Sequence, residues 1–397
     1  MSILSSVPMA PRDPILGLTE AFVADTRDAK VNLGVGVYLG EDGKVPLLQA
    51  VRHAEARLAA QPTARGYLPI DGMPSYNASV KNLVFGADAE VVSAGRVVTI
   101  QGLGGTGGLR IGAEFLRSIA GATTVLLSDP SWENHRAIFT RAGFTVAPYR
   151  YYDRAAHGVD FEGMLADLAA AAPGTVVVLH ACCHNPTGYD LTEEQWARVA
   201  EVVVTAGLVP FLDLAYQGFA GGLEADRAAV QRFSTLGIPV LVASSFSKSF
   251  SLYGERVGAL SLITADAEES ARVLSQLKVV IRTVYSNPPT HGAAVVSTVL
   301  GDAELRALWE QELAAMRDRI RAMRVSLVAE LEAVGVTGFG FIAEQIGMFS
   351  YSGLTTEQMQ ALRTDHAVYG TDAGRICVAA LNPSNVAAVA AAIAAVR

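Results

Sequence analysis

The sequence contains little cysteine and little charge. Only 3 of its 397 residues are cysteines, and two of them, Cys182 and Cys183, are adjacent. This low, odd count excludes a framework of disulfides and is typical of a reducing compartment, so we expect a cytoplasmic location. Charged residues make up 18% of the chain and the formal net charge is −8. Because Lys and Arg form no block, we expect nucleic acid not to be a partner.

Long apolar runs are also missing. No stretch reaches the roughly 18 consecutive apolar residues that a membrane-spanning helix needs, and the Ala- and Val-rich segment at 386–396 is too short. Residues 1–14 do not combine a basic start with an apolar run, so we expect neither a secretory signal nor membrane contact. In contrast, 51% of the residues are hydrophobic, which provides for a large core and excludes intrinsic disorder.

Short apolar runs rich in β-branched residues alternate with helical periodicity through the middle of the chain. We expect strands at Val97–Ile100, Thr123–Ser128, Phe144–Tyr149, Thr175–Ala181, Leu208–Leu214, Pro239–Ser244 and Val257–Ile263. One intervening helix starts after Leu191, where Thr192 and Gln195 have the spacing of a capping box. Continuous apolar strands separated by helices predict an α/β fold with a mostly parallel sheet that helices cover on both faces.

The C-terminal quarter has a different pattern, which predicts a smaller α+β domain. Its expected elements are one long helix, or two helices in series, at 303–334, strands at 336–343, 346–351 and 375–379, and helices at 355–367 and 383–396. The first residues of the chain show no repeating β-α pattern, so we assign them to the same domain. We therefore expect a large cofactor-binding domain at 44–302 and a small domain built from 1–43 and 303–397.

A glycine-rich turn from Gly102 to Gly108 follows the first of these strands and opens a helix. Unpaired N–H groups and the positive end of the helix dipole favour a phosphate at such a turn. Gly102, Gly104 and Gly107, followed by Asp129, also fit a dinucleotide fingerprint. A nicotinamide-dependent dehydrogenase is therefore an alternative.

Polar residues follow the later strands: Asn185, Asp213, Lys248 and Arg256. The carboxyl ends of parallel strands meet at one edge of a sheet, so we expect these side chains to share a crevice with the glycine turn. A phosphate cradle, a carboxylate, an asparagine and tyrosine (Tyr216) pair, and an amine that can form an imine together indicate pyridoxal phosphate. A hydride-transfer enzyme would leave most of these residues without a role.

The run from His180 to Gly188 also contains two cysteines and His184, which raises the possibility of a metal site. If the strand continued to His184, the two histidines would lie roughly 13 Å apart at about 3.3 Å per residue. Zinc needs all of its donors within about 2.0–2.3 Å. We therefore expect no metal.

Ordered motifs spread over nearly the whole chain. They are Val31–Tyr38, Tyr67–Ile70, Gly104–Gly107, Asp129–Trp132, His180–Gly188, Asp213–Phe219, Ser245–Lys248, Arg256–Ala259, Tyr285–Pro289 and Gly374–Ile376. In these motifs the chain resembles the class I pyridoxal-phosphate aminotransferases of fold type I, in their aspartate/aromatic subgroup. Within it the sequence is most similar to the bacterial tyrosine (aromatic amino acid) aminotransferases.

The resemblance implies roles for the residues around the cofactor ring. Lys248 would carry the cofactor as an imine and move a proton, and Asp213 would keep the pyridine nitrogen protonated with support from His135. Tyr216 and Asn185 would bond the phenolic oxygen and lower the pKa of the imine. Lys248, Asp213 and Tyr216 are thus the expected catalytic residues.

Further residues would complete the cofactor site. Trp132 would stack on the ring. The phosphate would be bound by Gly105, Thr106, Ser245, Ser247 and Arg256, together with Tyr67 from the other subunit of a homodimer.

The substrate would be held at both of its ends. The implied substrate-binding residues are Gly36, Trp132, Asn185, Arg282 and Arg375. Arg375 would grip the α-carboxylate while Gly36 closes over it, and Arg282 would reach the distal carboxylate from the other subunit.

The implied reaction is a ping-pong exchange of the amino group between an amino acid and 2-oxoglutarate. Leu39, Val45 and Gly66 at the expected entrance favour an aromatic ring, whereas Thr106 and Asn287 are typical of aspartate enzymes. We expect tyrosine, phenylalanine and aspartate as donors, with an aspartate-preferring enzyme or another pyridoxal-phosphate reaction as alternatives. A ligand sensor is disfavoured, because the chain shows no basic helix-turn-helix extension.

Overall fold

The computed structural model describes residues 2–10, 15–64 and 66–397. Residues 1 and 11–14, part of the N-terminal segment screened above for a secretory signal, lie outside the described residues. The chain divides into two compact units. The large unit comprises Val45–Arg321 and Gln345–Gly347, and the small unit comprises Met1–Lys44, Ala322–Glu344 and Met348–Arg397.

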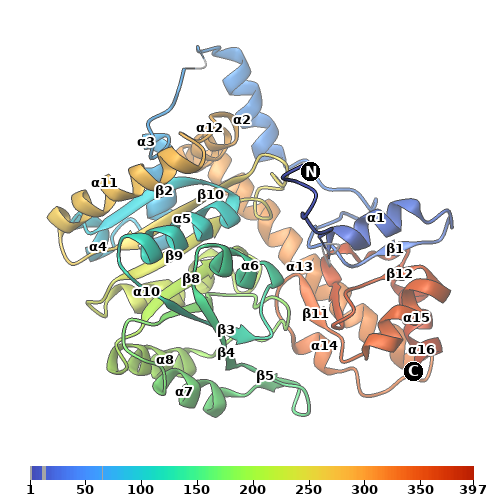
Figure 1. Ribbon diagram of the computed structural model, residues 1–397. Coiled ribbons are helices and arrows are strands. Elements are labelled where there is room, and N and C mark those ends of the chain that lie inside the picture. The colour runs from blue at the N-terminus through green and yellow to red at the C-terminus, as the bar shows by residue number, and fades with distance from the viewer. Residues whose placement is uncertain (1, 11–14, 65) are drawn as a thin grey trace. The chain divides into compact units, whose positions relative to one another are not determined.

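A seven-stranded sheet forms the centre of the large unit, in the order β2-β10-β9-β8-β7-β3-β4 (Figure 1). Its strands are β2 (Val97–Leu103), β3 (Thr124–Asp129), β4 (Thr145–Arg150), β7 (Val176–His180), β8 (Val209–Leu214), β9 (Val240–Ser245) and β10 (Val257–Ile263). Only β10 runs antiparallel to its neighbours among these seven. Each strand overlaps a run expected from the sequence, and the prediction of a mostly parallel sheet is confirmed.

Helices surround this sheet. They are α2 (Gln49–Ala60), α3 (Pro74–Phe85), α4 (Glu90–Ser93), α5 (Gly104–Ser118), α6 (Glu133–Arg141), α7 (Phe161–Ala169), α8 (Glu193–Thr205), α9 (Leu223–Asp226), α10 (Ala228–Ser234), α11 (Ala267–Val284) and α12 (His291–Gly301). The short hairpin β5 (Tyr152–Asp153) and β6 (Gly158–Val159) completes the unit. The predicted capping box of Thr192 and Gln195 is present at the start of α8.

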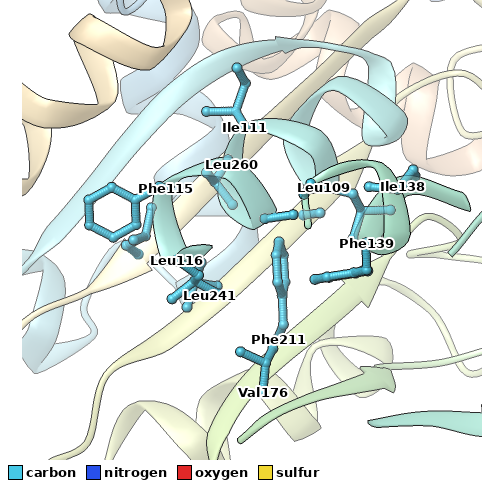
Figure 2. Packing of buried hydrophobic residues seen from close by; sticks show 14 of the residues in the cluster. Leu109, Ile111, Phe115, Leu116, Ile138, Phe139, Val176, Phe211, Leu241 and Leu260 are labelled. Atoms are coloured by element: carbon cyan, nitrogen blue, oxygen red, sulfur yellow. The ribbon is translucent and has the colours of Figure 1, made fainter. Parts of the chain in front are cut away.

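One hydrophobic core of the large unit lies between the sheet and helices α5, α6 and α11. Figure 2 shows Phe211 of β8 pointing toward α5 and α6, where Phe139 meets its ring edge-on at 5.9 Å. Phe139, Phe211 and Leu260 are fully buried. Because burial of each such side chain contributes about 1.5–3 kcal/mol, this layer holds the strand ends in place.

Two glycines of α5 let the helix approach the sheet closely. A Cβ at Gly108 would stand 2.7 Å from the carbonyl oxygen of Ala259, and a Cβ at Gly112 would stand 2.6 Å from the ring of Phe211. The residues lie one helical turn apart, on the same face. Part of the glycine cluster therefore serves packing.

The small unit contains two pairs of short strands and several helices. β1 (Val31–Asn32) pairs with β12 (Val368–Tyr369) in parallel, and β11 (Phe349–Tyr351) pairs with β13 (Arg375–Cys377) in antiparallel orientation. The helices are α1 (Leu16–Ala24), α14 (Phe341–Glu344), α15 (Thr356–His366), the 3₁₀ turn η1 (Val378–Ala380) and α16 (Val386–Val396). The N–H of Leu33 donates to Tyr369 at 2.7 Å and the N–H of Cys377 donates to Leu33 at 2.7 Å. The N-terminal segment is thus joined to the C-terminal one.

The long helix α13 (Ala303–Ala333) forms as predicted, but it contributes to both units. Residues 303–321, which we expected in the small domain, belong to the large unit. The indole of Trp309 explains this assignment, because it donates to the carbonyl of Ser249 at 2.7 Å and stacks on Phe250 at 4.5 Å.

The strand expected at 336–343 is wrong. That segment contains turns and the short helix α14. Gly335 and Gly338 adopt φ values of +84° and +87°, which interrupt an extended chain. Within the described ranges, no helix is long and apolar enough to cross a membrane.

We predict that Gly108→Ala lowers the free energy of unfolding by about 1–3 kcal/mol, because the new methyl group meets a backbone carbonyl that cannot move aside. Urea unfolding of purified protein measures the change. Gly301→Ala is the matched control, since this helical glycine has no atom within 4 Å of the added Cβ. Equal unfolding midpoints for the two variants would contradict the packing role.

Candidate functional site

The polar residues expected to share a crevice lie at one edge of the seven-stranded sheet. His180 at the end of β7 pairs in register with Asp213 of β8, and Ser245 at the end of β9 pairs with Gly258 of β10. Arg256 comes to the same edge because β10 is antiparallel and Arg256 precedes its first residue. The topology thus gathers residues that are far apart in sequence.

Asp213 is the most deeply set acid of this edge. It is buried, and its Oδ2 lies 2.9 Å from Nε2 of the fully buried His135. Ser131 holds the other ring nitrogen of His135, with Oγ 2.9 Å from Nδ1. Oδ1 of Asp213 is buried and has no hydrogen-bond partner among the described residues. A buried carboxylate oxygen without a partner is costly, which indicates that a ligand donates to it.

The surroundings keep Asp213 ionised. Burial raises the pKa of its carboxyl, but the hydrogen bond from His135 and the electrostatic effects of His135 and Lys248 outweigh burial and lower the pKa below the usual value. Behind it, His180 is buried, and desolvation lowers the pKa of its imidazole to about 3. The site therefore offers a fixed negative charge at neutral pH.

Lys248, Tyr216 and Asn185 lie together on the loops that follow these strands. Nζ of Lys248 stands 4.6 Å from the centre of the Tyr216 ring, and Nδ2 of Asn185 donates to the Tyr216 hydroxyl at 3.5 Å. The charge of Lys248 also helps to lower the pKa of Asp213.

An anion cradle lies at the N-terminus of α5. Gly104 has φ +68° and a Cβ there would lie 2.5 Å from Nη2 of Arg256, so only glycine leaves room for the guanidinium. Nη1 of Arg256 donates to Oγ of Ser247 at 3.2 Å, and the N–H of Ser247 donates to Ser245 at 3.3 Å.

The first turn of α5 is also suited to binding an anion. The residue that precedes α5, Leu103, has no side-chain oxygen for capping the first N–H groups. Gly105 and Thr106 lie in the first turn, and a Cβ at Gly105 would come within 3.2 Å of Ser245. Uncapped N–H groups, two hydroxyls and a guanidinium together match a phosphate.

Trp132 precedes α6 and meets the His135 ring edge-on at 5.2 Å, so its indole belongs to the Asp213 side of the site. Sequence reasoning missed the roles of Ser131 and His180 in holding His135. Only the spacing of four residues between Ser131 and His135 signals their contact.

Two other predicted residues, Tyr67 and Arg282, lie on the surface of the large unit. Tyr67 is 96% exposed, and Arg282 is exposed near the end of α11. In the small unit, Gly36 and Arg375 both adjoin Phe349. A Cβ at Gly36 would stand 2.5 Å from the Phe349 ring, and the guanidinium of buried Arg375 lies 4.4 Å from its centre.

The geometric argument used above against a metal site is wrong in one respect. β7 ends at His180, Cys183 turns with φ +52°, and the rings of His180 and His184 lie 4.2 Å apart rather than roughly 13 Å. The described residues nevertheless contain no group of three or more His, Cys, Asp or Glu side chains that could hold a metal ion.

Comparisons with known proteins agree with this geometry. The family model for class I and II aminotransferases matches residues 28–393. An aspartate aminotransferase of Pseudomonas aeruginosa is 59% identical over 395 residues, 99% of each chain. An aromatic-amino-acid aminotransferase of Escherichia coli is 50% identical over 386 residues, 97% of each chain. A crystal structure of an aromatic-amino-acid aminotransferase from Burkholderia pseudomallei, covalently bound to pyridoxal phosphate, is 62% identical, with a TM-score of 0.97 and full coverage of both chains.

We predict that His135→Phe lowers the free energy of unfolding of the cofactor-free protein by about 3 kcal/mol at pH 7, because Asp213 loses its partner. Without His135, burial dominates and raises the pKa of Asp213 above its unfolded value. The folded variant then takes up a proton as the pH falls. The difference in the free energy of unfolding between the variant and the wild type therefore becomes smaller between pH 7 and pH 5. Urea unfolding at both pH values measures it.

Phe139→Leu is the control, since it removes buried packing from the same helix without touching a charge. Its deficit should not depend on pH. A His135→Phe deficit that is equally independent of pH would show that the histidine does not set the protonation of Asp213.

Proposed function

Because the chain belongs to the family of class I and II aminotransferases, we propose that it uses pyridoxal phosphate to exchange an amino group between an aromatic amino acid or aspartate and 2-oxoglutarate. The observation that carries this proposal is the buried Oδ1 of Asp213, which has no partner among the described residues. It fits the protonated ring nitrogen of the cofactor, with Lys248 and the anion cradle available for its aldehyde and its phosphate.

Each residue of the cluster has a defined task in this proposal. When bound, the cofactor supplies an electron-accepting ring that stabilises the charge left after a substrate loses its α proton. Asp213, ionised because of its lowered pKa, holds a proton on the ring nitrogen, and His135 orients the carboxylate. Nζ of Lys248 would hold the aldehyde end of the cofactor and would also be the base that moves the substrate's α proton.

The remaining residues of the cofactor site would hold the cofactor in position and shield it from water. Tyr216 and Asn185 would donate hydrogen bonds to the phenolic oxygen of the cofactor, and Trp132 would cover one face of its ring and exclude water. The first turn of α5 would hold the phosphate, with Gly105, Thr106, Ser245, Ser247 and Arg256 as its partners.

For the substrate, we assign the α-carboxylate to Arg375, whose planar guanidinium suits a two-point bond. Gly36 is the small residue that we expect to close over this carboxylate. A side chain there would collide with Phe349, the ring on which Arg375 lies.

We further propose a homodimer in which Tyr67 and Arg282 reach the site of the partner subunit. Exposed apolar side chains accompany both residues: Tyr67 itself is 96% exposed, and Val279 and Val284, on either side of Arg282, are 57% and 50% exposed. Such a surface favours contact with a second subunit. Arg282 would then select dicarboxylates.

The cysteines Cys182, Cys183 and Cys377 are buried and unbridged, which supports a cytoplasmic location.

The proposed substrate range includes both classes of donor. Leu39, Val45 and Gly66 favour an aromatic ring, Thr106 and Asn287 favour aspartate, and the relatives carry both names. An enzyme that prefers aspartate is the alternative.

We predict that Lys248→Ala lowers kcat by at least about 10⁴-fold and changes the absorbance spectrum of the purified protein with its cofactor, because no lysine amine binds the cofactor covalently. Absorbance between roughly 330 and 430 nm and glutamate formation are the measurements. Normal transamination by the variant would refute the mechanism. Release of carbon dioxide or ammonia by the wild type, without glutamate, would identify another reaction.

We predict that Arg282→Ala lowers kcat/KM for aspartate by about 10²–10³-fold but changes kcat/KM for phenylalanine by less than about tenfold, because only aspartate has a distal carboxylate. A donor panel with 2-oxoglutarate measures both values. Arg272→Ala, an exposed arginine earlier on α11, is the control. An equal loss for both donors would contradict the assignment of Arg282.

A further inference from the structure

The loop that carries Asn185 has a tightly defined backbone. After β7 ends, Cys183 adopts φ +52°, and the N–H of Gly188 donates to the carbonyl of His184 at 2.8 Å. The turn 184–188 therefore closes on itself, and Asn185 is its second residue. The direction of the Asn185 side chain depends on the two peptide groups that enter this turn.

A partly buried carboxylate, that of Asp190, holds those two peptide groups. Oδ2 of Asp190 accepts the N–H of Cys183 at 2.6 Å, and Oδ1 accepts the N–H of His184 at 2.8 Å. Both oxygens are thus occupied by the residues that immediately precede Asn185. Burial raises the pKa of Asp190 to about 6, against the lowering effect of these two bonds, so the carboxylate is ionised at neutral pH.

The side chain of His184 adds a second attachment. Its Nε2 lies 2.9 Å from Oγ of Ser128, its Nδ1 lies 2.8 Å from Oγ1 of Thr187, and its ring stacks on Tyr151 at 4.0 Å. The peptide groups and the ring of the residue before Asn185 are therefore both anchored. Of these anchors, Asp190 alone carries a charge, and hydrogen bonds to a charged acceptor are the stronger ones.

We propose that Asp190 is a positioning residue for the transamination site: it clamps the entry of the turn and thereby aims the Asn185 amide at the phenolic oxygen of the cofactor. The inference rests on the proposed function. Asp190 itself touches neither cofactor nor substrate in this proposal. Its effect passes through Asn185, whose Nδ2 already lies 3.5 Å from the Tyr216 hydroxyl.

The variant Asp190→Asn tests the clamp. An amide of the same shape replaces one acceptor by an NH₂ group, which faces a peptide N–H and cannot accept from it. The turn loses one bond and the Asn185 amide loses its fixed direction. The hydrogen bond that Asn185 donates favours the deprotonated form of the Lys248–cofactor chromophore, so its weakening raises the pH midpoint of the absorbance change.

Two readouts are measured on the holoenzyme. We expect the pH midpoint of the chromophore to rise by about one unit in Asp190→Asn, the size of effect of one weakened bond to a charged oxygen. We expect the backbone amides of Cys183 and His184 to exchange with deuterium at least about tenfold faster than in the wild type. Asp160→Asn is the matched control, because Asp160 caps α7 by accepting the N–H of Gly163 at 3.0 Å.

The outcomes separate the hypotheses. A chromophore midpoint that stays unchanged in Asp190→Asn while amide exchange accelerates would reduce Asp190 to a structural residue and overturn the proposal. If the variant does not fold, hydrogen exchange of the wild type tests the proposal instead. Backbone amides of Cys183 and His184 that exchange as fast as those of an open loop would also overturn the proposal. Failure of the wild type to form any chromophore would refute the proposed function instead.

Discussion

The hydrogen bond between His135 and Asp213 is the interaction on which the rest of the site depends. A carboxylate in this buried position would be protonated if burial acted alone, because desolvation raises its pKa. The imidazole, itself held by Ser131, reverses that tendency and uses only one of the two oxygens. The other oxygen remains available for a cationic donor, which is the requirement that a pyridinium ring meets.

Helix α5 combines packing with anion binding through one repeated residue. Gly104, Gly108 and Gly112 recur every four positions, and a Cβ at these positions would meet Arg256, Ala259 and Phe211. The same face of the helix thus accommodates the guanidinium at its N-terminus and the sheet further along. Since the helix lies against β10, its uncapped first turn is held beside Arg256, and the stability of the core and the geometry of the cradle are coupled.

Carboxylates accept backbone N–H groups in two loops around the site. Asp190 accepts two N–H groups before Asn185, and Asp226 accepts those of Gly218, Ala220 and Gly221 after Tyr216. Loops at the ends of strands have no ladder to hold them, so their peptide groups need other partners. A carboxylate supplies two oxygens at once, and its charge strengthens both bonds.

The amino-acid sequence by itself determined the strands, because β-branched apolar runs of this length have one stable place, inside a covered sheet. It also determined the reactive groups at the strand ends, because parallel strands direct Asn185, Asp213 and Lys248 to a common edge.

Only the tertiary structure decided which contacts hold these reactive groups in place. The contact of His135 with Asp213 joins two segments that are far apart in the sequence. The two hydrogen bonds that Asp190 accepts are closer in sequence, but they form only because the chain turns back after His180. The first half of α13 joins the large unit because Trp309 finds its hydrogen-bond acceptor there. Such contacts leave no periodic pattern in the sequence, because each depends on a single pair of atoms rather than on a repeating face.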